Sequence, residues 1–100
     1  LYAATRAPLA IMELAAQALF LCQKIAAEGT SMAASDVTVA AALLRAAIDG
    51  AAATTLANTC WMQDRSLAQR INRQLDQLRR QGDDEARNAM DLAEKGLRRD

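Results

Sequence analysis

The sequence predicts an all-α fold, an antiparallel bundle of long helices within a single domain. Apolar residues make up 52% of the 100 residues, whereas aromatic residues make up 3%. The segments 8–28 and 35–58 contain one internal Gly and no internal Pro, and the apolar residues of the last third recur every three or four positions. A core of Ala, Leu, Ile, Val and Met is typical of helices. Because so short a chain buries only part of its apolar surface, we expect its stability to depend on a partner.

The first helix is predicted over residues 8–28. Pro8 suits the first helical turn, where its missing N–H would have no partner in any case. Glu13, Gln17 and Lys24 form one narrow polar strip on an otherwise apolar cylinder, so we expect other helices to cover most of its circumference. Gly29 follows at the position where a left-handed capping residue is most common.

The second helix is predicted over residues 35–58, with Ser35 or Asp36 as its N-cap. Arg45 and Asp49 are four residues apart and can form a weak ion pair along the helix. Their charges argue against a membrane-spanning segment, so no membrane contact is expected. Small residues dominate this helix, and Gly50 in its middle costs about 1 kcal/mol relative to Ala. We therefore expect another helix or a ligand to lie close to Gly50.

Two further helices are predicted over residues 64–80 and 83–97. Leu67, Ile71, Leu75 and Leu78 form a narrow apolar stripe, so the first of these helices packs through one face only. Gly82 interrupts the pattern, and acidic residues follow it as a helix N-terminus prefers. The pattern leaves open whether Gly82 breaks the helix or only bends it.

The charges argue against a nucleic-acid partner. The chain has 12 basic and 12 acidic residues and a formal net charge of zero. Acidic residues are interleaved with the arginines of the last third, and no aromatic residues are available there for base stacking. That segment is therefore interpreted as a solvated helix face; its arginines are Arg65, Arg70, Arg73, Arg79 and Arg80.

Cys22 and Cys60 are the only cysteines, and the sequence contains no histidine. This composition provides no zinc ligand set, so no metal is expected. Both thiols are predicted to be buried and reduced, as in a cytoplasmic protein.

The segment from Gly29 to Asp36 is the most promising place for a site, since it joins two helices predicted to be buried. The dipole of a helix favours negative charge at its N-terminus, so a carboxylate there would be ionised and oriented. Such a carboxylate suits a cationic ligand or a general base. The alternative is that Asp36 or Ser35 only caps the helix.

The same segment resembles the C-terminal half of the formiminotetrahydrofolate cyclodeaminase and methenyltetrahydrofolate cyclohydrolase family. That family carries a Gly-Asn-x-x-Ser-x-Ser-Asp pattern, a helix rich in Val and Ala, and then Gly-Ala-x-x-Asn-Val-x-x-Asn. The "APLAIMELAAQAL" stretch also looks like the family's Pro-Leu-led helix. This sequence differs at Thr30, Ala33 and Thr54. The matching positions are Gly29, Ser35, Asp36, Val37, Val39, Ala40, Ala41, Ala46, Ala47, Gly50, Ala51 and Asn58.

The resemblance implies an all-helical protein that associates as a homodimer through helix packing and binds a tetrahydrofolate derivative as substrate, without a metal. The family reaction either closes a formimino group onto the second folate nitrogen with loss of ammonia, or adds water to the methenyl bridge. Asp36 would be the catalytic residue, stabilising the positive one-carbon unit or positioning water. The substrate-binding residues implied are Gly29, Thr30, Ser35, Thr54 and Asn58.

The family's other half, with further active-site residues, is not among these 100 residues. The chain is therefore expected to form one helical half-domain, residues 1–100, of a larger enzyme and to be inactive alone. A second interpretation is a non-catalytic helical assembly module derived from the same scaffold. The substitutions at Thr30, Ala33 and Thr54 favour this second interpretation.

Overall fold

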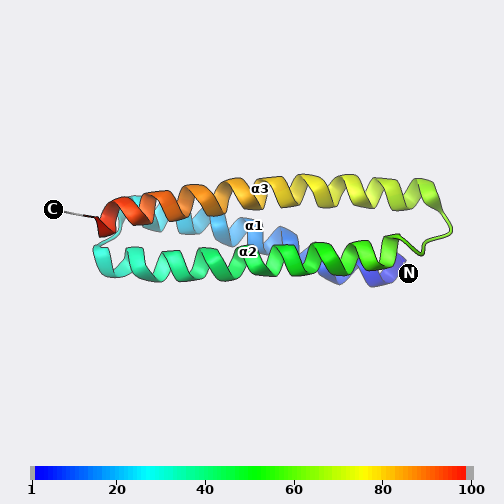
Figure 1. The fold of residues 1–100 in the computed structure, drawn as a ribbon, viewed down its shortest axis with the longest axis horizontal. Helices are drawn as coiled ribbons and strands as arrows, with labels where there is room; N and C mark the ends of the chain where they lie inside the picture. Colours follow the sequence, from blue (N-terminus) through cyan, green and yellow to red (C-terminus); the bar gives the residue numbers. More distant parts are fainter. Residues whose placement is uncertain (1, 99–100) are drawn as a thin grey trace.

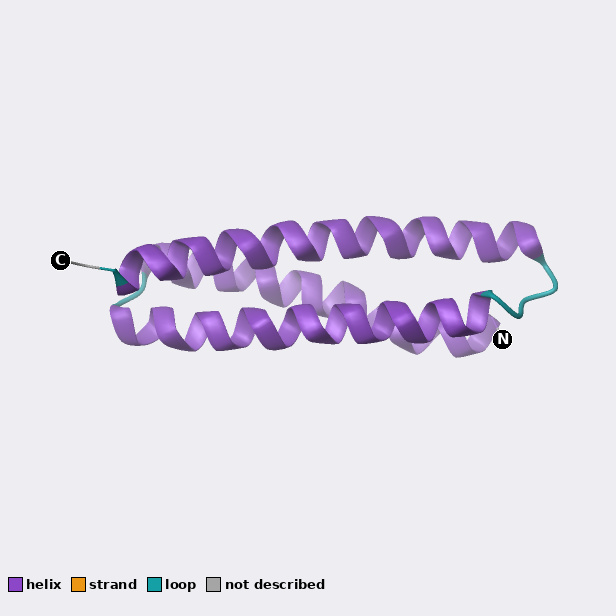
Figure 2. Ribbon diagram, viewed as in Figure 1, coloured by secondary structure: helices purple, strands orange, loops and turns teal. Residues whose placement is uncertain are grey.

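The computed structural model describes residues 2–98 and shows three helices, α1 (Tyr2–Glu28), α2 (Ser31–Thr59) and α3 (Arg65–Leu97). They run antiparallel to their chain neighbours in one elongated bundle of 57 × 16 × 15 Å (Figure 1). Every pair of helices is in contact. Within the described residues only short turns connect the helices, and no strand is present (Figure 2). The predicted all-α bundle is confirmed.

The helix α1 begins at Tyr2, six residues before its predicted start. Pro8 consequently lies inside the helix and is buried, so its placement in the first turn was wrong. A proline inside a helix removes one backbone hydrogen bond, which costs stability unless packing offsets it. Upstream of Pro8, the Thr5 hydroxyl donates to the Tyr2 carbonyl at 2.7 Å, which ties the first turn together.

The helix α3 is continuous from Arg65 to Leu97, which corrects the two helices predicted over 64–80 and 83–97. Gly82 lies within it and is buried. A β-carbon at position 82 would collide with the Cδ1 atom of Ile48 on α2. Gly82 therefore allows α2 and α3 to approach closely, and it neither ends nor divides the helix.

The core follows rows of residues whose spacing alternates between three and four, as helix packing requires. Small side chains fill much of it, which allows the bundle to be narrow. On α2 the core row consists of Ala34, Val37, Ala41, Leu44, Ile48, Ala51 and Thr55. On α1 it consists of Thr5, Pro8, Met12, Ala15, Leu19 and Cys22.

Hydrogen bonds fix the turn between α2 and α3. The side chain of Asp64 caps α3. Arg65 Nη1 donates to the carbonyl oxygens of Thr59 at 2.8 Å and Met62 at 2.9 Å. The Thr59 hydroxyl donates to Asn72 Oδ1 at 2.8 Å. The bond from Arg65 to Thr59 satisfies a carbonyl at the end of α2 that has no partner within the helix, and the other bonds hold the turn and the start of α3 in place.

Two ion pairs join α2 to α3 further along. Arg45 Nε lies 3.3 Å from Asp83 Oδ1, and Arg79 Nε lies 3.5 Å from Asp49 Oδ1. Both pairs are partly exposed, so each contributes at most about 1 kcal/mol. Arg45 and Asp49 therefore pair with α3, and the ion pair predicted between them along α2 is replaced.

By length and composition alone, α1 and α2 are each able to cross a membrane. Helices in the core of a soluble protein meet the same criteria. Only 28% of the apolar window of each helix is buried inside the bundle. Much of their apolar surface consequently faces outward.

Candidate functional site

The N-cap of α2 is Thr30, with φ −78° and ψ 172°. Its side-chain oxygen accepts a hydrogen bond from the backbone N–H of Ala33 at 3.3 Å. The helix begins at Ser31, so Ser35 and Asp36 lie in its second turn, and the predicted capping by either was wrong. The field of the helix dipole falls off within the first turn, so Asp36 lies beyond the part of α2 where that field is strong.

Gly29 is required by space and not by backbone angle. No glycine in the described part of the chain has a positive φ, so the predicted left-handed cap was wrong. A β-carbon at Gly29 would lie 2.7 Å from the Ile25 carbonyl oxygen and 3.0 Å from the Ala33 β-carbon. The link between α1 and α2 therefore turns too tightly for a larger residue.

Asp36 is exposed, as is the neighbouring Ser35. On α2 it stands between Met32, one turn before it, and Val39, one turn after it, both of which are exposed. Asp36 takes part in none of the ion pairs found between described residues. Its carboxylate is therefore accessible to a ligand and to water, with two exposed apolar side chains beside it.

Thr54 and Asn58 lie near the opposite end of the same helix. Their side chains bond to their own helix: Thr54 Oγ1 donates to the Gly50 carbonyl at 3.0 Å, and Asn58 Nδ2 donates to the Thr54 carbonyl at 2.9 Å. Asp36 and Thr54 are five turns apart, which corresponds to about 27 Å along the axis. One chain therefore does not bring the predicted site residues together.

A second row of residues follows α2 on the face opposite its core row, and sequence reasoning missed it. Its spacing alternates between four and three, and every member is exposed. We call it the outer row of α2; it consists of Met32, Asp36, Val39, Leu43, Ala46, Gly50, Ala53 and Ala57. Apart from its chain neighbours and the adjacent backbone of its own helix, no described atom lies within 4 Å of a β-carbon built at Gly50, so the predicted close contact at Gly50 is not made within the described chain. The sequence contains a pattern that could have revealed this row. Two residues after each core position from Ala34 to Thr55 stands a member of the outer row, so the two rows have the same spacing.

The helix α1 has an outer row as well, again with alternating spacings of four and three. It consists of Ala7, Ile11, Leu14, Ala18, Leu21 and Ile25. Leu14 is 64% exposed and Leu21 is 57% exposed. On α1 the core face lies between this row and the polar strip, and Glu13 of that strip accepts a hydrogen bond from Gln74 of α3 at 3.2 Å. The outer row of α1 therefore lies on the side away from α3, toward α2.

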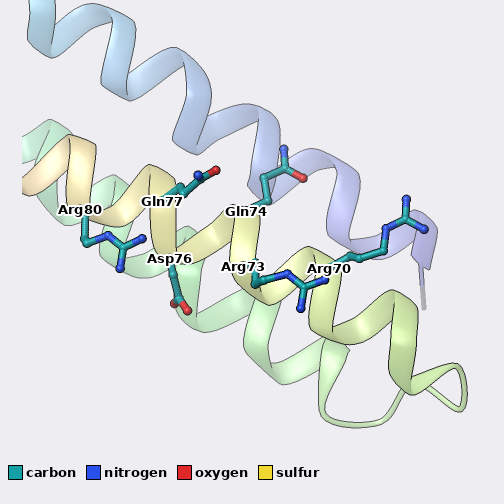
Figure 3. A pocket seen from close by; sticks show the side chains of 6 residues that line it. All are labelled: Arg70, Arg73, Gln74, Asp76, Gln77 and Arg80. Carbon is teal, nitrogen blue, oxygen red and sulfur yellow. The ribbon is translucent and has the colours of Figure 1, made fainter.

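A surface depression on α3 collects several charged and amide side chains (Figure 3). All of the side chains that line it come from α3, and Gln74 among them extends toward α1, where it bonds to Glu13. Asp76 lies among the arginines and reduces their net positive charge. The lining residues are Arg70, Arg73, Gln74, Asp76, Gln77 and Arg80. None of them is among the residues predicted to bind folate.

The two cysteines are free and differ in exposure. Cys22 is buried as predicted, and burial raises the pKa of its thiol. Cys60 is exposed, so its predicted burial was wrong; its Sγ donates to the Ala57 carbonyl at 3.3 Å. Between residues 2 and 98, no group of three or more His, Cys, Asp or Glu side chains could hold a metal ion.

These observations define an all-helical bundle with a charged helix, two largely apolar outer rows, and the exposed carboxylates of Glu28 and Asp36 near the Gly29–Thr30 link. The family model for formiminotransferase-cyclodeaminase matches residues 1–77, and the chain belongs to this family. The match corresponds to the C-terminal domain and includes both α2 segments that carry the motif. No curated protein and no solved structure matches the chain.

Proposed function

We propose that the chain forms part of a folate-dependent one-carbon enzyme and binds a tetrahydrofolate derivative beside Asp36. The family match supports this proposal, since it includes the Gly29–Asp36 and Gly50–Asn58 segments. The chain is thus related to folate one-carbon enzymes. The roles of individual residues given below are part of our proposal.

The proposed role of Asp36 follows from the charge of the substrate. The one-carbon unit is amidine-like and carries positive charge, whether it is a formimino group or a methenyl bridge. Asp36 is exposed, so its carboxylate would stabilise such a cation strongly only where the bound substrate and a further protein surface exclude water from it. Because Asp36 lies beyond the first turn of α2, the helix dipole contributes little to this effect. The carboxylate of Asp36 itself would provide it.

A single carboxylate does not complete either reaction. Loss of ammonia requires a proton at the leaving nitrogen, and hydrolysis requires a water molecule from which a proton is removed. The other acidic residue of α2, Asp49, pairs with Arg79, and the chain has no histidine. Glu28, at the end of α1 beside Gly29, is a second exposed carboxylate near the link. We propose that residues outside this chain supply the remaining groups of the catalytic site.

Thr30 has a changed role within this proposal. Its hydroxyl accepts a hydrogen bond from the Ala33 amide, so it holds the start of α2 in place. Gly29, in the link, and Ser35, in the second turn of α2, are both exposed and would contact the substrate. Thr54 and Asn58 would contribute only if they belong to a different copy of the chain, because of their distance from Asp36.

The second candidate function is a non-catalytic assembly module, which the exposed outer rows of α1 and α2 favour. Both candidates include self-association, and we propose that the protein is a homodimer. The free Cys22 and Cys60 suit a reducing compartment, so we propose a cytoplasmic location.

Calorimetric titration with 5-formyltetrahydrofolate, a stable reduced folate, tests the folate proposal. We expect micromolar binding that is lost in Asp36→Asn. Asp84→Asn is the matched control, because Asp84 is an exposed acid outside the family match, and it should bind as the parent does. Equal binding by both variants would contradict the role of Asp36, and no binding by an intact helical dimer would favour the assembly module.

A further inference from the structure

We propose that a second copy of this chain packs on the outer row of α2, with the two α2 helices antiparallel and closest at Ala46. The inference rests on the self-association proposed above and adds the face, the direction and the register. It is independent of whether folate binds.

The sizes of the side chains along the outer row point to this arrangement. Before Ala46 the large members are Met32, Val39 and Leu43, and after it the members are Gly50, Ala53 and Ala57. A two-fold axis beside Ala46 sets each residue of one half opposite a residue of the other half. Leu43 then faces Gly50 of the second copy and Val39 faces Ala53. Leu43 and Val39 thus each meet a smaller residue, as close packing requires, and Met32 reaches beyond the last member of the opposite row.

A parallel pair would lack this fit. Leu43 would meet its own equivalent, and so would Gly50, which leaves an overfilled stretch beside an empty one. The two Asp36 carboxylates would also be adjacent, and like charges in apolar surroundings repel strongly. In the antiparallel pair these carboxylates are about 30 Å apart. Size and charge therefore select the same direction.

The region around the row extends the same surface. The outer row of α1 lies on the side toward α2, with Leu14 and Leu21 more than half exposed. Arg45 and Asp49, the charged residues in the middle of α2, are turned to α3 by their ion pairs. The contact can therefore spread from α2 over α1 without burying an unpaired charge near its centre.

The arrangement also joins the two parts of the candidate site. Within one chain, Asp36 and Asn58 lie near opposite ends of α2. In the antiparallel pair Asp36 faces Ala57 of the second copy, directly beside Asn58. A pair of chains then contains two equivalent sites, each with the acidic segment of one copy and the Asn58 segment of the other. One chain alone would hold no complete site.

Disulfide formation measures the register. Cys60→Ser serves as the background, because it removes the exposed thiol. In this background Ala46→Cys is compared with Ala53→Cys under mild oxidation without folate. A disulfide requires Cα atoms within about 7 Å. Two copies of residue 46 meet at the proposed axis, whereas two copies of residue 53 are about 20 Å apart. We expect Ala46→Cys to yield a two-chain species and Ala53→Cys to remain largely unlinked.

An exchange of sizes tests the fit in the same Cys60→Ser parent. Gly50→Leu places Leu against Leu43 of the second copy and should raise the dimer Kd by about 10- to 100-fold, the usual effect of overpacking. The double variant Leu43→Gly with Gly50→Leu restores one large and one small residue at each contact and should regain most of the affinity. Sedimentation equilibrium measures both. A side chain at position 50 meets no other helix of its own chain near its β-carbon, so the variants should still fold. Circular dichroism of the helices checks this.

The outcomes separate this inference from self-association itself. A dimer that does not cross-link through residue 46 overturns the proposed face and leaves self-association standing. Equal cross-linking through residues 46 and 53 overturns the antiparallel direction. A protein that stays monomeric at all concentrations overturns both this inference and the proposed self-association. If that monomer also floats with phosphatidylcholine vesicles, lipid and not a second copy covers this face.

Discussion

Ile48 of α2 occupies with its Cδ1 atom the space that a β-carbon at residue 82 of α3 would need. Ile48 is fully buried, so the atom has little room to move elsewhere. Gly50, only two residues from Ile48, faces away from the bundle with no atom near its missing side chain. Two glycines in the middle of helices thus have opposite environments.

Substitution of each glycine by alanine should separate these environments. In Gly50→Ala we expect the free energy of unfolding of the single chain to rise by about 1 kcal/mol, because Ala favours helix more than Gly does. In Gly82→Ala the same gain is opposed by an overpacking cost of about 1 to 3 kcal/mol. Urea unfolding at dilutions where the chain is monomeric measures both.

The clash itself is checked by adding Ile48→Val, which removes the Cδ1 atom. Ile48→Val alone should lose about 0.5 to 1.5 kcal/mol. Combined with Gly82→Ala, it should cost less than the two single effects added together. Strict additivity would contradict the contact described between Ile48 and Gly82.

The start of α2 gives a second test. Thr30→Ala removes the cap and should lower the free energy of unfolding by about 1 kcal/mol. Ser35→Ala is the matched control, because Ser35 is exposed in the second turn and should change stability by less than about 0.5 kcal/mol. A larger loss in Ser35→Ala than in Thr30→Ala would mean that the helix begins where the sequence first suggested.

The two ion pairs between α2 and α3 should be sensitive to charge and salt. Asp83→Arg places two positive side chains together and should destabilise the bundle, and adding Arg45→Asp should recover part of the loss. The coupling measured by this cycle is expected to be about 1 kcal/mol or less, since both side chains are partly exposed. At 1 M salt the coupling should shrink further. A coupling that did not depend on salt would contradict an electrostatic origin.

Cys22 provides a prediction for alkaline pH. Burial raises the pKa of its thiol above the ordinary value of 9.0, so the unfolded chain loses this proton at a lower pH than the folded chain. The stability contributed by the neutral thiol is therefore fully present below pH 9 and is lost as pH rises toward the folded-state pKa. Thermal unfolding between pH 8 and 10.5 should show this decline in the parent and in Cys60→Ala. Cys22→Ala should show a smaller decline, although its overall stability is lower.

The helices themselves were largely predictable, because apolar spacing is a local property of the sequence. Their boundaries were less so. Several residues able to cap a helix follow Gly29, and the tight turn at Gly29 selects Thr30 over Ser35 and Asp36. Gly82 appeared to end a helix because its propensity is poor, yet the contact with Ile48 outweighs that cost.

The sequence supplies candidate site residues, which stay a prediction, but it does not supply their geometry. The motif singles out Asp36 and Asn58, and no local pattern states that one straight helix carries both. The outer row of α2 is hard to recognise for a related reason. Its small residues also fit a single close contact at Gly50, whereas the row continues in both directions from that residue.

The family match ends at residue 77, in the middle of α3. The second half of α3 supplies the buried Ala86, Ala89 and Ala93, and the first half of α2 supplies Ala34 and Val37 to the same cluster. The packed core therefore continues beyond the region shared with the family. A shorter chain cut at that point would lack the half of α3 that covers one end of the α1–α2 hairpin, so we expect it to unfold more readily than the whole chain.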